Sequence, residues 1–120
     1  MFENNGNGTF VQIVSGPLVT DAVTSEAAAW GDYDNDGDVD LFLAVGGGTN
    51  ALNRLYRNDG GGNFTSITTG IVVNEMSSTF GAAWADYDND GFLDLFVANY
   101  NNQNNFLYHN DGNGNFSKII

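Results

Sequence analysis

Short apolar runs, separated by segments rich in glycine, asparagine and aspartate, make up most of the chain. In one run Leu93, Leu95 and Val97 alternate with Phe96 and Ala98, so both faces of the segment are apolar. A run of this length predicts a strand that is buried on both faces. Such a strand needs a neighbouring layer on each side, as in a radial stack of sheets.

Helical patterns are scarce in the sequence. Val23–Trp30 is the one segment whose spacing would fit a short helix, but its counterpart Ser77–Trp84 contains a Phe-Gly pair, which argues against a helix. The small residues of Glu26–Trp30 and Phe80–Trp84 fit inner strands at a place where several sheets converge. The pattern therefore predicts an all-β chain.

Three segments share a hairpin pattern, in which aromatic residues flank a turn rich in Asn, Asp and Gly. They are Phe2–Phe10, Tyr56–Phe64 and Tyr108–Phe116. Turns of this composition join two antiparallel strands. The segments recur at intervals of about 50 residues, which is the length of a propeller blade.

Each repeat predicts four antiparallel strands. We expect them at about 24–31, 39–45, 52–58 and 63–69 in the first copy, and at about 78–85, 93–99, 105–110 and 115–120 in the second. We assign residues 1–15 to an extra outer hairpin, 16–70 to a first blade and 71–120 to a second blade. The predicted fold class is all-β, with two four-stranded antiparallel β-propeller blades per chain.

An acidic nine-residue pattern lies between the first two predicted strands of each copy, at Asp32–Asp40 and Asp86–Asp94. Aspartates occupy loop positions 1, 3, 5 and 9, and position 6 is glycine in both copies. This spacing points alternate carboxylates at one centre, and the glycine allows the left-handed turn that wraps the backbone around it. The pattern predicts a site for a hard cation with oxygen ligands.

Calcium (Ca2+) is the cation we expect, because it accepts six to eight oxygens in a flexible arrangement. The predicted side-chain ligands are Asp32, Asp34, Asp36 and Asp40 in the first loop, and Asp86, Asp88, Asp90 and Asp94 in the second. Position 7 normally contributes a backbone carbonyl, which adds Asp38 and Phe92 to the predicted sites.

Three alternatives to a calcium loop fit the residues less well. Metal-free turns would leave several carboxylates crowded together, and these would repel one another. An EF-hand needs a Glu at position 12 and flanking helices, but Leu43 and Val97 occupy that position. Soft metals lack ligands, since the chain has no Cys and its single His109 is distant from both loops in sequence.

The chain is strongly acidic, with 15 Asp and Glu residues against three Lys and Arg, for a net charge of −12. This balance gives no electrostatic reason to bind nucleic acid or anionic lipid. No apolar run is long enough to span a membrane. Weak calcium sites fill where calcium is plentiful, so we expect an extracellular or cell-surface location.

The sequence resembles a known family at the residues of the acidic loops. Phe80–Val97, with its Phe-Gly pair, Trp84 and Asp-rich loop, is similar to the FG-GAP/VCBS repeat of integrin-α-like β-propellers. Ala28–Phe42 is a second match that lacks the Phe-Gly pair. The resemblance implies calcium binding by the Asp-rich loop between the first two strands of a blade. It also implies extracellular adhesion or ligand binding, including lectin-like roles, in propellers that usually close at seven blades.

Ligand binding is expected in the loops that differ between the copies, at the end of the blades opposite the acidic loops. These are Gly16–Thr24, Val45–Asn53, Gly70–Ser77 and Asn99–Asn105. The last contains Tyr100 and many amides, which suits sugar hydroxyls, although a solvated polar loop explains it more simply. We expect Trp30 and Trp84 to cover the interface between blades rather than to bind a ligand.

No catalytic residue is predicted. His109 aligns with Arg57 and Glu3, and a position that accepts three such different side chains is expected to face solvent. No Ser or Thr has an evident base partner, and no glycine loop has the lysine of a phosphate site. We therefore expect a non-enzymatic module.

Two function classes remain open. The favoured one is a calcium-stabilised β-propeller module for extracellular adhesion or for carbohydrate or protein binding. The alternative is a fragment or accessory part of a larger secreted enzyme that acts on polysaccharides. Because propellers close with typically four to eight blades and this chain supplies two, we expect a homo-oligomer, with a trimer of six blades favoured.

Overall fold

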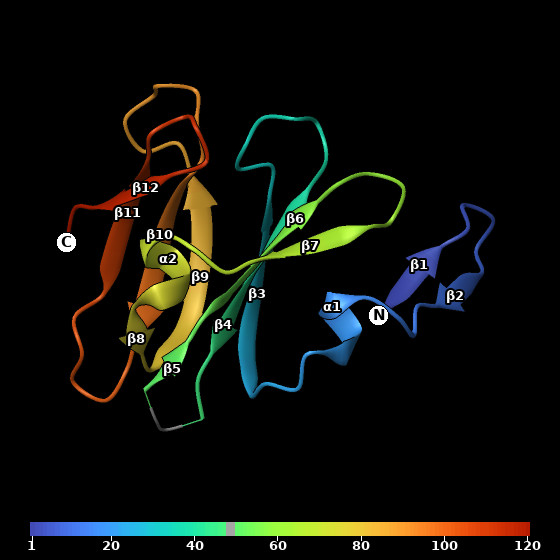
Figure 1. Cartoon of the computed structure of the whole chain (residues 1–120), viewed down its shortest axis with the longest axis horizontal. Helices are drawn as coiled ribbons and strands as arrows, with labels where there is room; N and C mark the ends of the chain where they lie inside the picture. The colour runs from blue at the N-terminus through green and yellow to red at the C-terminus, as the bar shows by residue number, and fades with distance from the viewer. Residues whose placement is uncertain (48–49) are drawn as a thin grey trace.

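The computed structural model describes residues 1–47 and 50–120. Two four-stranded antiparallel sheets dominate it, and each follows the order of the chain (Figure 1). The first contains β3 (Ser25–Gly31), β4 (Asp40–Val45), β6 (Arg54–Asn58) and β7 (Phe64–Ile67). The second contains β9 (Thr79–Ala85), β10 (Asp94–Asn99), β11 (Phe106–Asn110) and β12 (Phe116–Lys118). The eight predicted strands are confirmed, and each observed end lies within two residues of the predicted one.

The two sheets have the same register at equivalent positions. Leu41 pairs with Trp30 on one side and Tyr56 on the other. Leu95 pairs in the same way with Trp84 and Tyr108. The sequence repeat is therefore a structural repeat, down to which side chains lie opposite one another across the ladder.

Two smaller, two-stranded sheets accompany the four-stranded ones. β1 (Phe2–Asn4) and β2 (Phe10–Gln12) form the hairpin that the N-terminal turn predicts, and it lies apart from both sheets (Figure 1). β5 (Ala51–Leu52) pairs with β8 (Met76–Ser77) and so links the connections of the two sheets. The predicted loop Val45–Asn53 contains residues 48–49, which lie outside the described residues.

Two one-turn helices, α1 (Pro17–Thr20) and α2 (Ile71–Asn74), precede the first and the second sheet. We did not predict them. Each follows a glycine in the left-handed region, Gly16 with φ 91° and Gly70 with φ 96°. One turn is too short to show a helical period in the sequence, which explains the omission. No helix among the described residues is long and apolar enough to cross a membrane.

The core lies between the two sheets, where their first strands β3 and β9 run side by side. Trp84 reaches across this boundary: its ring stacks on Tyr33 at a centroid distance of 5.9 Å, and its Nε1 donates a hydrogen bond to the Ala29 carbonyl at 3.1 Å. Phe42 and Phe116 complete the aromatic cluster around it. The prediction that Trp84 covers the interface between blades is confirmed.

The same prediction is wrong for Trp30, which is 51% exposed. Its position in the first sheet matches that of Trp84, but no sheet of the described chain packs against that face. The expectation of burial on both faces also fails in β10, where Phe96 is 40% exposed, while it holds for Phe42 in β4. Sequence pattern identifies a face that suits burial, but it does not supply the neighbour.

Candidate metal centre

Both acidic loops adopt the same backbone path. Position 4 is left-handed in each, with φ 58° at Asn35 and φ 62° at Asn89, and position 6 is left-handed at Gly37 and Gly91, with φ 95° and 93°. Asn tolerates this region better than other side chains, and Gly has no Cβ to oppose it. The glycine requirement was predicted, whereas the role of the asparagine was not.

The position-1 and position-9 carboxylates hold the first loop closed. Asp32 accepts hydrogen bonds from the backbone N–H groups of Asp36 and Gly37, at 3.1 and 3.0 Å. Asp40 is fully buried and accepts from the N–H groups of Tyr33 and Asn58, at 3.0 and 2.7 Å. These hydrogen bonds therefore fix the conformation of the loop without a bound cation.

The second loop repeats these contacts. Asp86 accepts from the backbone N–H groups of Asp90 and Gly91, at 3.1 and 3.0 Å. Asp94 is buried and accepts from the N–H groups of Tyr87 and Asn110, at 3.1 and 2.8 Å. The common arrangement shows that the spacing of the aspartates fixes the loop geometry in both copies.

One buried carboxylate oxygen in the first loop, Asp34 Oδ1, has no hydrogen-bond partner among the described residues. Burial, and next the charge of Asp36, raise the pKa of Asp34. A buried acceptor without a donor is costly, and a cation among the carboxylates would satisfy it.

The ionised form of Asp40 is disfavoured as well. Burial raises its pKa to about 6, against the hydrogen bonds from Asn58 and Tyr33, which lower it. The nearby carboxylates of Asp34 and Asp36 add to the rise. This clustering of negative charge is the electrostatic condition that a bound divalent cation relieves.

The structure brings most predicted ligands together. Oxygens of Asp32, Asp34 and Asp36 lie within 4.8 Å of one another, as do those of Asp86, Asp88 and Asp94. Oxygen-only donor sets of this kind suit Ca2+ or Mg2+ rather than a soft metal. The residues of both loops thus fit a hard divalent cation.

Position 7 of each loop stays a prediction as a carbonyl ligand. Its side chains lie against the outer hairpins: a Cβ built on Gly60 would lie 3.1 Å from Asp38 Oδ2, and one built on Gly112 would lie 2.6 Å from the Phe92 ring. Both glycines are left-handed as well. The acidic loops and the hairpins therefore share one end of the sheets, as expected (Figure 1).

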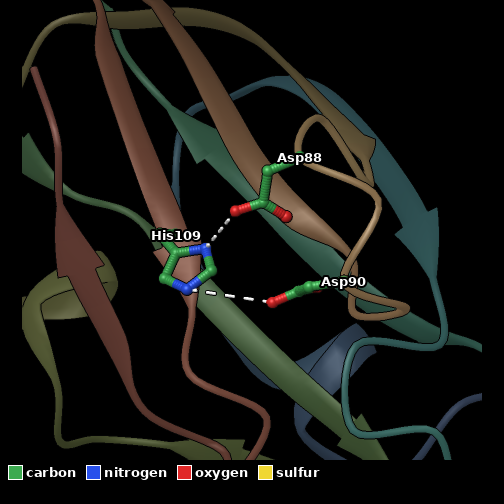
Figure 2. Close-up of side chains that lie close together, drawn as sticks. All are labelled: Asp88, Asp90 and His109. Atoms are coloured by element: carbon green, nitrogen blue, oxygen red, sulfur yellow. Dashed lines mark ion pairs between the residues drawn. The ribbon is translucent and has the colours of Figure 1, made fainter.

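The expectation that His109 faces solvent is wrong, and its ring lies beside the second loop although the residue is distant from that loop in sequence. Its side chain is only 25% exposed. Its Nδ1 lies 3.3 Å from Asp88 Oδ2 and 3.2 Å from Asp94 Oδ1, and its Nε2 lies 3.8 Å from Asp90 Oδ2. Figure 2 shows the ring between Asp88 and Asp90. Distance along the sequence was misleading because strand pairing carries β11 back beside the loop.

Asn110 is a second residue that sequence analysis missed. It is fully buried, and its Nδ2 donates to the carbonyls of Tyr33 at 2.7 Å and Leu93 at 3.0 Å. Its side chain thus connects the first acidic loop to the residue that directly precedes β10 in the second sheet. Asn35 adds another link, since its Nδ2 donates to the Gly91 carbonyl at 3.0 Å. The repeated Asn of the hairpin pattern was the available signal.

The Asn99–Asn105 loop uses much of its amide chemistry internally. Asn99 donates from Nδ2 to the Asn104 carbonyl at 2.8 Å, and Asn105 Oδ1 accepts from the Asn99 N–H at 2.9 Å. Gln103 Oε1 accepts from the Ser78 N–H at 2.7 Å. Tyr100 meets the Phe80 ring edge-on at 6.3 Å. These contacts favour the simpler explanation of a self-supporting polar loop.

A hollow of about 410 Å³ lies instead at the metal end, between the first sheet and the outer hairpin of the second. Asp34, Arg57, Asn113 and Asn115 contribute polar groups to its lining, and Tyr33 contributes an aromatic ring. No local sequence signal indicates this hollow, because its walls come from both repeats.

The fold and the paired acidic loops define a repeat of four-stranded antiparallel sheets, each with an aspartate cluster that is compatible with a Ca2+ site. The FG-GAP-like repeat model matches residues 1–43, 32–97 and 86–120, and the chain belongs to this family. The chain is also 32% identical over 100 residues to cartilage acidic protein 1 of Xenopus tropicalis, a match that covers 82% of this chain and 15% of that protein. It therefore spans a small part of the length of this relative. No solved structure matches it significantly.

Proposed function

We propose that the chain is a calcium-stabilised, non-enzymatic binding module of extracellular or cell-surface proteins. The observation that carries the calcium proposal is the buried, unpartnered Asp34 Oδ1 within a doubled set of aspartates. In the first loop Asp32, Asp34, Asp36 and Asp40 would hold the cation, and in the second Asp86, Asp88, Asp90 and Asp94 would do so. The ion would neutralise the crowded carboxylates and so favour the folded state.

Thermal unfolding in chelator and in Ca2+ tests this proposal. A ligand that binds only the folded state stabilises it by about 2.7 kcal/mol per site at a hundredfold excess over Kd. We expect a clear rise in Tm in millimolar Ca2+, and we expect Asp34→Ala and Asp88→Ala each to remove one site's share of it. A Tm that responds to neither Ca2+ nor chelator would contradict the proposal.

The binding role is adhesion, or recognition of a carbohydrate or protein. Membership of the FG-GAP-like family supports it, together with variable loops on a rigid pair of sheets. The alternative, an accessory part of a larger secreted polysaccharide-acting enzyme, also fits, because the chain spans 15% of its relative. Adhesion stays the favoured proposal because the alternative needs catalytic residues that would lie on repeats outside this chain.

A glycan and protein binding screen, with and without Ca2+, tests the role and locates the site. Replacement of Tyr100, Asn101 and Asn102 by Gly and Ser alters the far loop, whereas Asn113→Ala with Asn115→Ala alters the hollow at the metal end. We expect the far-loop change to abolish binding without lowering the calcium-dependent Tm. Loss of binding only in the hairpin variant would place the ligand at the metal end instead.

Assembly completes the proposal. Trp30, Tyr87 and Phe96 leave two apolar faces exposed, one on the outer side of each sheet. The buried contact between the sheets already pairs the same kinds of face, through Tyr33, Phe42 and Trp84. We propose that copies of the chain associate head to tail in the same way, and that a trimer of six blades closes the ring.

Light scattering in Ca2+ tests the assembly. A trimer that dissociates on Trp30→Ser would support it. A stable monomer of 12.9 kDa with a cooperative melt would contradict it, because two blades would then fold without covering their outer faces. Association only when further repeats of a longer chain are added would show that these repeats, not other copies, cover the faces.

A further inference from the structure

The two acidic loops contact each other directly through Asn35. This residue occupies position 4 of the first loop, between the predicted ligands Asp34 and Asp36, and its backbone is left-handed with φ 58°. Its Nδ2 donates to the carbonyl of Gly91 at 3.0 Å. Gly91 is position 6 of the second loop, and its N–H donates to Asp86 Oδ2 at 3.0 Å. One side chain thus joins the two loops.

Asn110 makes a second connection, between the position-9 carboxylates of the two loops. Its backbone N–H donates to Asp94 Oδ1 at 2.8 Å, and its Nδ2 donates to the Tyr33 carbonyl at 2.7 Å. The N–H of Tyr33 donates in turn to Asp40 Oδ2 at 3.0 Å. Asp40, Asp94 and Asn110 are each at most 1% exposed. Hydrogen bonds in such dry surroundings are stronger than exposed ones, so this path is a firm link between the loops.

The counterparts of both asparagines make no such link among the described residues. Asn89 has the loop position and the left-handed backbone of Asn35, with φ 62°, but it contacts no other acidic loop. Asn58 is the counterpart of Asn110, and its Nδ2 donates to the Val39 carbonyl of its own sheet. The chain therefore offers matched positions with and without a contact between loops.

The two loops share a reason to depend on each other. In each loop, oxygens of three aspartates lie within 4.8 Å of one another. Without a cation these carboxylates repel one another and oppose the closed loop, and a bound cation removes that repulsion. The contacts of Asn35 and Asn110 require both loops to be closed. A cation that holds one loop closed therefore favours the closed form of the other, and this coupling is reciprocal.

We propose that Asn35 and Asn110 are positioning residues that couple the two cation sites, so that Ca2+ in the second loop raises the affinity of the first. The inference rests on the proposed function, because it takes both loops as Ca2+ sites. It adds that the sites fill cooperatively rather than independently. Repulsion between two bound cations would have the opposite sign, so positive cooperativity is the mark of the hydrogen-bonded link.

Calcium titrations of the full chain after chelator treatment test the coupling, with one backbone amide as the reporter in each loop. The ¹H–¹⁵N signal of Gly37 reports the first loop, and that of Gly91 reports the second. In the wild-type chain we expect both signals to move together, with a Hill coefficient above one. Asp88→Ala removes a predicted ligand of the second loop. It should weaken the Ca2+ binding seen at Gly37 by about fivefold, the lower end of typical couplings between sites.

The same comparison in an Asn35→Gly background isolates the contact. Glycine keeps the left-handed backbone and removes the amide. The negative charge lost in Asp88→Ala weakens the first site equally in both backgrounds, so the difference between backgrounds measures the link. We expect the fivefold effect to fall to about twofold, because the Asn110 contact remains. In Asn89→Gly, the matched control, it should stay about fivefold. All chains are compared at one protein concentration, and circular dichroism confirms that each variant folds.

Independent titrations of Gly37 and Gly91 in the wild-type chain, each with a Hill coefficient of one, would overturn the inference without any variant. An Asp88→Ala effect of equal size in the wild-type and Asn35→Gly backgrounds would overturn it too, because charge alone would then explain it. In both cases Ca2+ still binds each loop. Failure of the proposed function is distinct, since neither amide would then respond to Ca2+ and the Tm would not rise.

Discussion

The two sheets carry related residues at matching positions but place them in opposite surroundings. Tyr33 follows the first strand of the first sheet and is 4% exposed, whereas its counterpart Tyr87 is 47% exposed. Phe42 is fully buried, while Phe96 is not. The second sheet covers the first, and no described residue covers the far face of the second. Burial here depends on the place of a repeat in the array more than on its own sequence.

The tryptophans show the same contrast in the other direction. Trp84 of the second sheet lies in the interface, where its Nε1 donates to the Ala29 carbonyl. Trp30 of the first sheet has the same register in its own ladder, but among the described residues its ring pairs with Phe64 alone, in a T-shaped arrangement with the centroids 6.3 Å apart. Each sheet therefore has one face that carries a tryptophan and one face against which a tryptophan can pack. Among the described residues, one such contact forms, that of Trp84.

The largest expected effect comes from the matched pair Phe42→Ala and Phe96→Ala. Phe42 is enclosed between the sheets, and deletion of a buried ring costs about 3–5 kcal/mol of unfolding free energy. At protein concentrations low enough to keep the chain monomeric, Phe96→Ala should cost about 1 kcal/mol or less, since part of its ring is then in water. Urea denaturation in Ca2+ measures both.

Equal losses in the two variants would break this comparison. That outcome would mean that the far face of the second sheet is covered in solution, as the proposed head-to-tail association requires. The measurement should therefore be repeated over a range of protein concentrations. A Phe96→Ala cost that grows with concentration would reveal the covering copy.

A second matched pair tests the links near the metal loops. Asn110→Ala removes donors from the carbonyls of Tyr33 and Leu93 and so disconnects two sheets at a buried point, at an expected cost of about 1–3 kcal/mol. Asn58 is its counterpart in the first sheet, and among the described residues its Nδ2 donates to the Val39 carbonyl alone. Asn58→Ala should cost about 1 kcal/mol or less, because its site is more exposed.

Thermal unfolding with and without Ca2+ measures this second comparison. The Asn110→Ala variant should lose stability in both conditions, because its side chain bridges backbone groups. A variant that lost stability without Ca2+ but not with it would contradict this expectation. In that case the contact with Tyr33 would matter only while the loop carboxylates repel one another, and it would not be a structural link between the sheets.

The sequence predicted the local structure well, because its signals are local. The Asn-Gly turns and the alternation of Leu95 with Phe96 define hairpins and strands whatever surrounds them. The aspartate spacing likewise indicated the loops. What it missed depends on contacts between segments distant in the sequence, such as His109 over Asp88 and Asn110 on Tyr33. The short helices α1 and α2 were missed because one turn has no period.

The smallest expected effect is one that should be equal in both sheets. The Tyr56 hydroxyl donates to Asp21 Oδ2 at 2.8 Å, and the Tyr108 hydroxyl donates to Glu75 Oε2 at 2.9 Å. Asp21 and Glu75 directly follow α1 and α2 as their C-cap residues. Each tyrosine thus ties the third strand to the helix that precedes its own sheet, away from the exposed faces. Tyr56→Phe and Tyr108→Phe should each cost about 1 kcal/mol.

These tyrosines also set a pH dependence with a defined sign. Burial, followed by the hydrogen bond to the carboxylate, raises the pKa of both phenols above the ordinary value of about 10. A group whose pKa is raised by folding contributes stability that is complete below its unfolded pKa and is lost as the pH rises through its folded pKa. The unfolding free energy should therefore fall above about pH 10, and less so in the Tyr56→Phe, Tyr108→Phe double variant. Unfolding curves between pH 8 and 11 check this, and a double variant with the same slope as the wild-type chain would assign the loss to other groups.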